Sequence, residues 1–466
     1  MCLTGFLPSS VFSLHILHKI LILFKLTREK CIFMLRYRNM HKYLFTIISL
    51  SSLLISSQSK ATTLEELIGE VVSVHPQIKE AKWDANASRQ DKKMEAWLDD
   101  PMGMVEFEEV PFRKKSLGNA GMTNFSVSQE IPFLGTLITK AGAAKKEWLS
   151  KKAMVDSATR EIIFETKKTY FELLAVTNKK QSAEKMLQSL AGISSSLETQ
   201  YKSTLAQKPA TSEMNPGNEP TMKGGTASDL LMAKMKQAEA KTQVHDLSHQ
   251  LDALRAKLNL LRGKDPEASL GTLAKPKRKT LKSNAEDILE KILKQNSDLQ
   301  SVEFMFQKAK KDLTVAKLSY IPTLEPSFTY NQRQDMENAY TLGVGFNIPL
   351  WVNKKSAETK KAHAEKKRAE NTLASTVLNV KEEFYYLYHH AHEHSKIVGT
   401  YENEILPLAK SSMSLALQEY KTGLSSGPNV LQKIISYEQA NQMYWNMWFD
   451  YQMEYALLEK LTGEDL

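Results

Sequence analysis

Cysteine is almost absent from this chain, which has only Cys2 and Cys31 among its 466 residues. Beyond residue 31 the sequence can form neither a disulfide framework nor a thiolate metal site. After residue 61 no segment reaches the ~18 consecutive apolar residues of a membrane-spanning helix. The sequence also lacks a nucleophile with its base, a phosphate-cradling glycine loop and a paired-carboxylate site. We therefore expect no enzymatic activity and no cofactor.

The first 61 residues have the composition of a leader. Basic residues up to Lys42 precede an apolar run over residues 43–55, and Ser59 and Ala61 supply the small side chains of a cleavage site. We interpret residues 34–61 as a secretory signal peptide. Residues 1–33 are interpreted as lying upstream of the true start, Met34 or Met40, with an N-terminal membrane anchor as the alternative.

Little charge imbalance remains once the leader is set aside. The whole chain carries 62 Lys and Arg against 53 Asp and Glu, a net charge of +9. Residues 1–61 hold eight of the basic residues and one acid, which leaves 62 − 8 = 54 basic and 53 − 1 = 52 acidic residues. A net charge of +2 gives no support to nucleic-acid binding, and we expect no nucleic-acid partner.

An internal repeat organises the remaining chain. The segment that begins Ser228, Asp229 recurs 200 residues later as Pro428, Asn429, and Gly263 recurs as Gly463. We divide the chain into a first repeat over residues 62–263, a linker over residues 264–283 and a second repeat over residues 284–466. Each repeat is predicted to run helix, strand, strand, long helix, helix. The basic run from Lys275 to Lys279 is interpreted as part of a solvated linker.

Three segments alternate between apolar and polar residues with the period of a β-strand, and a fourth, residues 102–110, does so less clearly. Strands of ~9–11 residues with one apolar face suit the wall of a transmembrane barrel, although a soluble sandwich would also use them. Four strands cannot close even a small barrel of ~8 strands, whereas three chains would supply twelve. The positions predicted to face lipid are Phe125, Val127, Ile131, Phe328, Tyr330, Leu342, Val344, Phe346 and Ile348.

Two segments, residues 135–201 and 352–420, are rich in Ala, Lys, Glu and Leu and contain a single proline, Pro407. A helix of ~65 residues spans on the order of 100 Å, longer than an ordinary domain. Such helices must pack against one another. Steps of four and three residues in the second segment predict a coiled-coil seam through Val380, Phe384, Leu387, Ala391, His394, Val398, Tyr401, Ile405 and Leu408.

This ordered set of features resembles the TolC-like outer-membrane efflux family over nearly the whole mature chain. The resemblance rests on the doubled unit, on the strand end at Ser128 to Pro132 and on the turn from Tyr420 to Leu431. Asp99 to Met102 resembles the branch that serves heavy-metal exporters. The resemblance implies a homotrimer in the cell outer membrane that extends into the periplasm, with a twelve-stranded β-barrel above a long α-helical barrel. Its implied partners are a periplasmic adaptor protein, an inner-membrane pump and outer-membrane lipid.

The resemblance also implies that the tips of the helical hairpins dock the adaptor. Carried over by position, these tip residues are Ser228 and Asp229 in the first repeat and Gly423, Leu424, Ser425 and Asn429 in the second. The first tip departs from the family pattern, because an insertion with three prolines replaces its glycine. The acidic residue that narrows the entrance in some relatives is replaced here by Met232 and Gln432.

A histidine cluster is the most distinctive polar feature of the sequence. His390 and His394 stand four residues apart, as do His389 and Glu393, with His392 between them. Helical spacing of this kind can present two ligands to Zn²⁺, Cu²⁺ or Ni²⁺. Solvated or interhelical histidines are the alternative interpretation.

The sequence thus predicts a mainly α-helical protein with a small β part: long antiparallel coiled-coil helices and four strands per chain. The predicted function is a passive exit duct for substrates, with heavy-metal cations favoured by the resemblance. Two alternatives stay open, a secreted or periplasmic coiled-coil structural protein and a periplasmic metal-binding protein.

Overall fold

The computed structural model describes residues 63–112, 116–206, 226–276, 278–279 and 284–464. The predicted signal peptide and the segment upstream of it lie outside these residues, as does most of the insertion at the first hairpin tip. Residues 62–466 form one compact unit, which contains all of the described residues.

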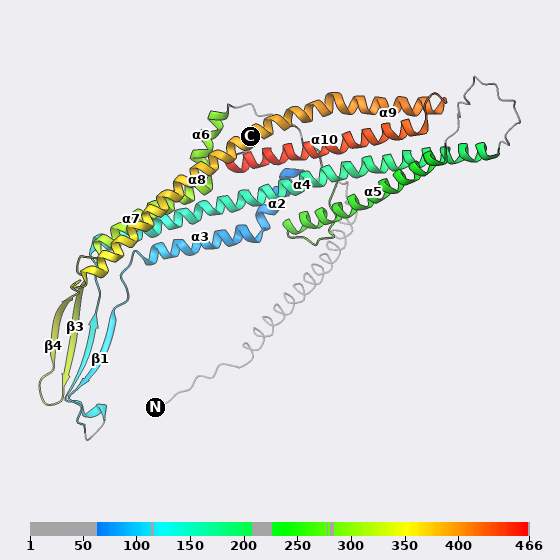
Figure 1. Cartoon of the computed structure of the whole chain (residues 1–466). Helices are drawn as coiled ribbons and strands as arrows, with labels where there is room; N and C mark the ends of the chain where they lie inside the picture. The colour runs from blue at the N-terminus through cyan, green and yellow to red at the C-terminus, as the bar shows by residue number, and fades with distance from the viewer. Residues whose placement is uncertain (1–62, 113–115, 207–225, 277, 280–283, 465–466) are drawn as a thin grey trace, which may run out of the picture. The chain divides into compact units, whose positions relative to one another are not determined.

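Helices make up most of this unit (Figure 1). No helix in the described ranges is both long enough and apolar enough to cross a membrane. The helices are α2 (Leu64–Val74), α3 (Pro76–Met94), α4 (Leu134–Ala206), α5 (Ala227–Leu261), α6 (Ala285–Gln295), α7 (Ser297–Leu318), α8 (Val352–Thr400), α9 (Leu406–Lys421) and α10 (Gly427–Thr462), with a short 3-10 helix at Leu117–Asn119 and a π-helical turn at Tyr401–Ile405.

Four strands form one antiparallel sheet in the order β1-β2-β3-β4. They are β1 (Met102–Glu108), β2 (Met122–Ser128), β3 (Leu324–Arg333) and β4 (Ala339–Phe346). The pairing of β2 with β3 joins segments from the two halves of the chain. β1 ends at Glu108, earlier than the pattern predicted, because Glu109 adopts a left-handed backbone conformation with φ of 57°.

The order of elements is the same in both halves of the chain. Two helices, two strands, a long helix and a final helix run from α2 to α5 and again from α6 to α10, where the π turn divides the long helix into α8 and α9. α5 and α10 begin exactly one repeat apart, at Ala227 and Gly427. A proline lies between helix and strand at every change from one to the other: Pro101, Pro132, Pro322 and Pro349. Proline cannot donate to a hydrogen-bond ladder, and it keeps the preceding residue out of the α region.

α4 is the central element of the helical part. Its 73 residues pack against α2, α3, α5, α7 and α10. The main core lies where α4 meets α5 and α10, and aromatic rings fill much of it: Phe171 and Trp448 meet edge to face at a centroid distance of 6.0 Å. A second core lies towards the hairpin tips around Leu197 and Leu431. A third joins α6, α8 and α10 around Phe384 and Leu387.

The predicted seam of α8 is correct only as far as the π turn. Val380, Phe384, Leu387, Ala391 and Val398 are buried, but Leu408 is 70% exposed. Pro407 has no N–H to donate to the preceding turn, and the helix widens at Tyr401–Ile405 immediately before it. The wider turn shifts the inner face by one residue, so that Ala409 takes the position predicted for Leu408.

The described basic residues of the linker are exposed, as expected for a solvated run, but they also contact the helices. The Lys275 ammonium lies 5.1 Å from the ring centroid of Trp445. Arg278 pairs with Glu402 at 3.6 Å, and Lys279 pairs with the buried carboxylate of Glu459. These partners come from α10 and from the π turn, more than a hundred residues away, so the local charge pattern could not reveal them.

Leu387 provides a direct test of the third core, because its side chain is almost completely buried there. We expect Leu387→Ala to lower the free energy of unfolding by about 2–5 kcal/mol, since it removes buried methyl groups and leaves a cavity. The volume-conserving Leu387→Met should cost less than about 1.5 kcal/mol. Chemical unfolding followed by helical circular dichroism measures both. An equal loss of unfolding free energy in the two variants would contradict close packing around Leu387.

Candidate functional site

One face of the sheet is apolar and exposed. Residues paired across the strands share a face, so Val105, Phe125, Tyr330 and Tyr340 form one row. Val127, Phe328 and Leu342 form the next row. Each of these side chains is at least 40% exposed, and Phe328 stacks on Tyr340 at a centroid distance of 6.5 Å. An apolar surface of this extent needs an apolar partner.

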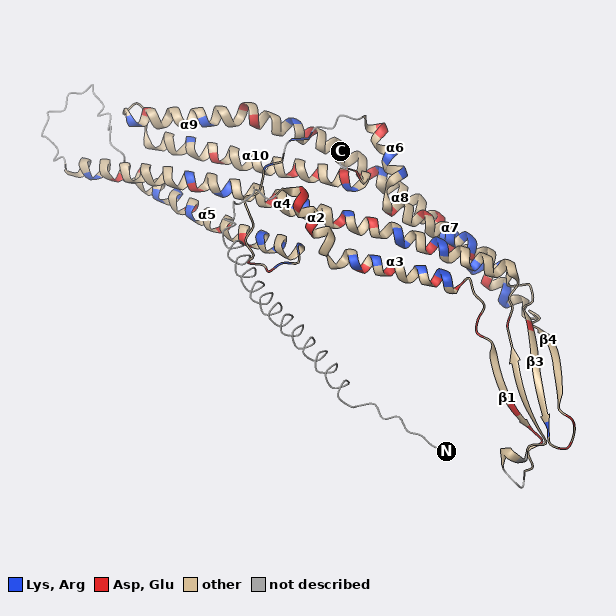
Figure 2. Ribbon diagram, turned by 180° about the vertical axis from the view of Figure 1, so that it is seen from behind, with Lys and Arg blue, Asp and Glu red and all other residues tan. Residues whose placement is uncertain are grey.

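The opposite face of the sheet is polar. Asn124 and Asn331 face each other across β2 and β3, and both are buried. The Asn124 amide donates a hydrogen bond to Glu108 at 2.8 Å, and the Asn331 amide donates to the hydroxyl of Thr341 at 3.0 Å. β3 and β4 carry few charged residues, whereas charges of both signs are spread along the helices (Figure 2). The two faces of the sheet therefore differ in polarity.

Two positions predicted to face lipid lie beyond the ends of the strands. Ile131 follows β2 and joins Leu324 in an isolated bridge, with N–H to O=C distances of 2.7 and 3.0 Å. Ile348 follows β4, and its carbonyl accepts a hydrogen bond from the Leu350 backbone. Both side chains are exposed. The alternation continues past the strand ends because Pro132 and Pro349, the residues that directly follow Ile131 and Ile348, keep the preceding backbone extended.

The second hairpin tip is a tight turn between α9 and α10. Gly423 has φ of +76°, and the Leu424 N–H bonds back to the Glu419 carbonyl at 2.8 Å, which closes the end of α9. The Asn429 amide donates to the Ser425 hydroxyl at 2.9 Å. Gly427 is buried, and a Cβ there would lie 2.8 Å from Leu197. These contacts leave Leu424 82% exposed at the end of the hairpin.

In the first tip, the two predicted residues differ in their roles. Asp229 caps α5 by accepting from the Thr226 backbone N–H at 3.0 Å, while the Thr226 hydroxyl accepts from the Asp229 N–H at 3.1 Å. Ser228 is exposed beside it. Asp229 therefore has a structural role whether or not it contacts another protein.

The structure brings together two of the four predicted histidines. Nδ1 of His394 lies 2.9 Å from a carboxylate oxygen of Glu454 on α10, and Nδ1 of His390 lies 3.8 Å from its other oxygen. Burial raises the pKa of Glu454, although the hydrogen bond with His394 opposes that shift. His389 and His392 are exposed and do not join this group. Sequence reasoning missed Glu454, because 60 residues separate it from His394.

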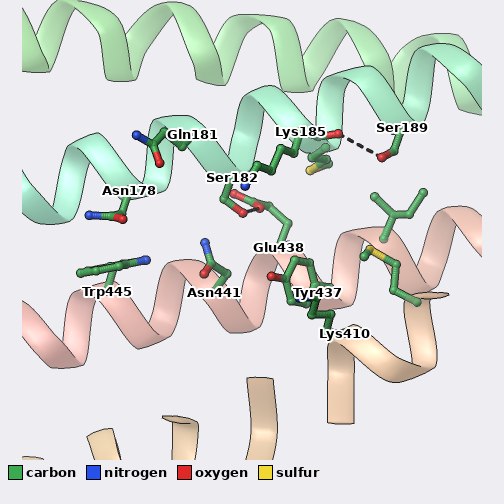
Figure 3. A pocket seen from close by; sticks show the side chains of 13 residues that line it. Asn178, Gln181, Ser182, Lys185, Ser189, Lys410, Tyr437, Glu438, Asn441 and Trp445 are labelled. Atoms are coloured by element: carbon green, nitrogen blue, oxygen red, sulfur yellow. Dashed lines mark hydrogen bonds between the residues drawn. The ribbon is translucent and has the colours of Figure 1, made fainter. Parts of the chain in front are cut away.

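A cavity of about 320 Å³ lies between α4, α9 and α10 (Figure 3). Polar and apolar side chains both line it, and the buried carboxyl of Glu438 accepts a hydrogen bond of 2.5 Å from Ser182. Burial raises the pKa of Glu438. The amide nitrogen of Asn441, also buried, has no hydrogen-bond partner within the described residues. No pattern in the sequence indicated this cavity, because its lining comes from three helices.

The comparisons with known proteins agree with this architecture. Residues 288–464 match the family described as outer membrane efflux protein. VceC of Vibrio cholerae aligns with a TM-score of 0.69 and 16% identity over 86% of this chain and 97% of its own. A membrane protein from Pseudomonas aeruginosa aligns with a TM-score of 0.72 and 13% identity, covering 86% of this chain and 90% of its own. The Campylobacter jejuni CmeC outer membrane channel aligns with a TM-score of 0.70 and 15% identity, covering 86% of each chain. No match was found among curated protein sequences.

The buried carboxyl of Glu438 leads to a pH-dependent prediction. Since its pKa is raised in the folded state, the folded protein binds a proton more tightly than the unfolded chain. The protonated Glu438 carboxyl therefore stabilises the fold relative to the ionised one, and this stabilisation is lost as pH rises above the ordinary glutamate pKa of about 4.3. Glu438→Gln keeps an acceptor for Ser182 and removes the charge. We expect the variant to melt at a higher temperature than wild type at pH 7.5, with the difference vanishing near pH 4. A difference that is constant with pH would contradict the assignment.

Proposed function

We propose that this protein is an outer-membrane channel, the passive exit duct of a tripartite efflux system, because residues 288–464 match the outer membrane efflux protein family and the described chain shares the fold of solved outer-membrane channels. The chain is placed in the outer membrane, with its helices extending into the periplasm. In the proposed system, an inner-membrane pump and a periplasmic adaptor deliver the substrate, and the duct itself performs no chemistry.

The apolar face of the sheet is the observation that carries this proposal. A soluble protein rarely exposes a contiguous apolar surface of this kind, because contact between apolar side chains and water is unfavourable. Lipid is a suitable partner for it. A soluble coiled-coil scaffold, the main alternative, would leave this surface without a partner.

The edges of the sheet favour a homotrimer. Among the described residues, β1 and β4 each pair with one neighbouring strand, so the outer edge of each keeps unpaired backbone groups there. Within a bilayer such groups must find partners, because no water is present to bond them. If β1 of one chain pairs with β4 of the next, three chains close a barrel of twelve strands. The polar face with Asn124 and Asn331 would then line the interior.

The hairpin tips are the proposed docking surface for the adaptor. Leu424 stands out from a turn that is closed by backbone hydrogen bonds, so its exposed side chain could insert into a partner. Ser228, Ser425 and Asn429 lie on the same two tips and would supply polar contacts around it.

Heavy-metal cations are the proposed cargo, on the resemblance of Asp99 to Met102 to the metal-exporting branch. A periplasmic metal-binding protein is the second candidate, favoured by the group of His390, His394 and Glu454. The two differ in location, since a duct fractionates with the outer membrane and a metal buffer with the soluble periplasm.

Phe328 and Thr329 are neighbours on the central strand β3 and point to opposite faces. We expect Phe328→Arg to reduce the trimer recovered from outer-membrane fractions severely, because an arginine facing lipid near the bilayer midplane costs about 2–4 kcal/mol. Thr329→Arg, which faces the barrel interior, should assemble at near wild-type levels. Equal recovery of the two variants would count against the proposed membrane-facing side.

Leu424→Glu tests the docking surface. We expect it to abolish transport and crosslinking to the adaptor encoded in the same genome, because a charge replaces the exposed apolar contact. Trimer assembly and outer-membrane recovery should stay unchanged. Lys421→Glu, a charge change on the last residue of α9, is the control and should affect transport weakly. Crosslinking measures docking, and unchanged crosslinking in the Leu424 variant would refute docking through this tip. Growth of the wild type and of a deletion strain on toxic metal salts tests the cargo class.

A further inference from the structure

We propose that His390, His394 and Glu454 form a resident site for a late divalent transition-metal cation such as Zn²⁺, which fastens α8 to α10. A resident cation at this site is independent of the proposed cargo. It combines two side chains from α8 with one from α10.

The geometry of the group suits one cation. A ligand atom from each of the three residues lies within 4.8 Å of the other two. In a tetrahedral zinc site, with bonds of about 2.0–2.1 Å, ligand atoms lie about 3.3 Å apart. The Nδ1 atoms of both histidines face the same carboxylate, at 2.9 and 3.8 Å. A small side-chain rotation would therefore complete three bonds without moving the helices.

The charge balance at the site favours a cation. The side chain of Glu454 is only 12% exposed, and Asp450, one turn earlier on α10, adds a second negative charge nearby. Within the described residues, the ion pairs of Glu454 involve these two histidines and neither a lysine nor an arginine. A divalent cation would neutralise the buried carboxylate more completely than a neutral imidazole does.

The surroundings hold the ligands in place. The ring of Tyr386 lies 4.2 Å from that of His390, and Leu387, Ala391 and Leu458, close to the ligands in sequence, are buried in the third core. Such supporting contacts fix the orientation of metal ligands. His390 keeps its side chain 43% exposed, which leaves an open fourth position for water.

An ordinary ion pair between His394 and Glu454 is the competing explanation. It accounts for the hydrogen bond but gives no role to His390, whose Nδ1 also faces the carboxylate. A second histidine pair provides a comparison within the same chain. His245 and His249 on α5 lie with their Nε2 atoms 3.1 Å apart, but both are exposed, and no third ligand joins them among the described residues.

The location of the site gives the cation a structural consequence. It lies between the third core and the π turn at Tyr401–Ile405, where α8 changes its inner face. A bound cation would lock α8 to α10 just before that turn and stabilise the folded chain by mass action.

Zinc titration of the purified full chain tests the proposal. The protein is prepared in detergent without a histidine tag, stripped with a chelator, and carries His245→Ala and His249→Ala to remove the second pair. We expect one Zn²⁺ per chain by calorimetry, a rise in melting temperature with Zn²⁺, and a Co²⁺ absorption spectrum typical of nitrogen and oxygen ligands.

Three variants in that background decide the outcome. His390→Gln and Glu454→Gln should each weaken Zn²⁺ binding at least tenfold and remove the thermal shift. His389→Ala with His392→Ala should bind as the background protein does. His390 is half-exposed, so its variant tests the site even if Glu454→Gln destabilises the fold. Absence of binding, or unchanged affinity in His390→Gln, would overturn the proposal.

Discussion

The packing of α4 against its neighbours is the interaction on which the structure depends. A helix of 73 residues has no core of its own, and most helical stability comes from burying an apolar face. α4 buries different faces against α5, α7, α10 and α3 along its length. Loss of any one neighbour would expose part of that helix. The doubled element order follows from this need, since each long helix requires partners from both halves of the chain.

The same helices set the position and register of the sheet. β2 leads directly into α4, and β3 follows α7, which packs on α4. The pairing of β2 with β3 therefore continues the contact between α4 and α7. Because side chains alternate along a strand, fixing this register places the aromatic residues on one face and both buried asparagines on the other. The apolar face that requires lipid is a consequence of helix packing as well as of the sequence pattern.

Polar groups inside the helical part mark the places where packing is incomplete. Glu438 and Asn441 border the cavity between α4, α9 and α10, and Glu454 meets two histidines between α8 and α10. Each of these carboxyls is buried enough for its pKa to rise. Buried polar groups cost stability unless they find partners, so their presence on α10 is the feature most in need of a functional explanation.

Local periodicity determined much of this protein from sequence alone: the long helices, the four strands and the proline junctions followed from patterns within a few residues of each position. It failed where a distant residue or a backbone irregularity decides the outcome. The π turn before Pro407 moved the seam away from Leu408, and Glu109 ended β1 early. Glu454 lies beside His390 and His394 because folding brings together segments that are far apart in the sequence. The ion pairs of Glu402 and Glu459 with the linker arise in the same way. A period records which face of an element is apolar, but not which side chain from another element will meet it.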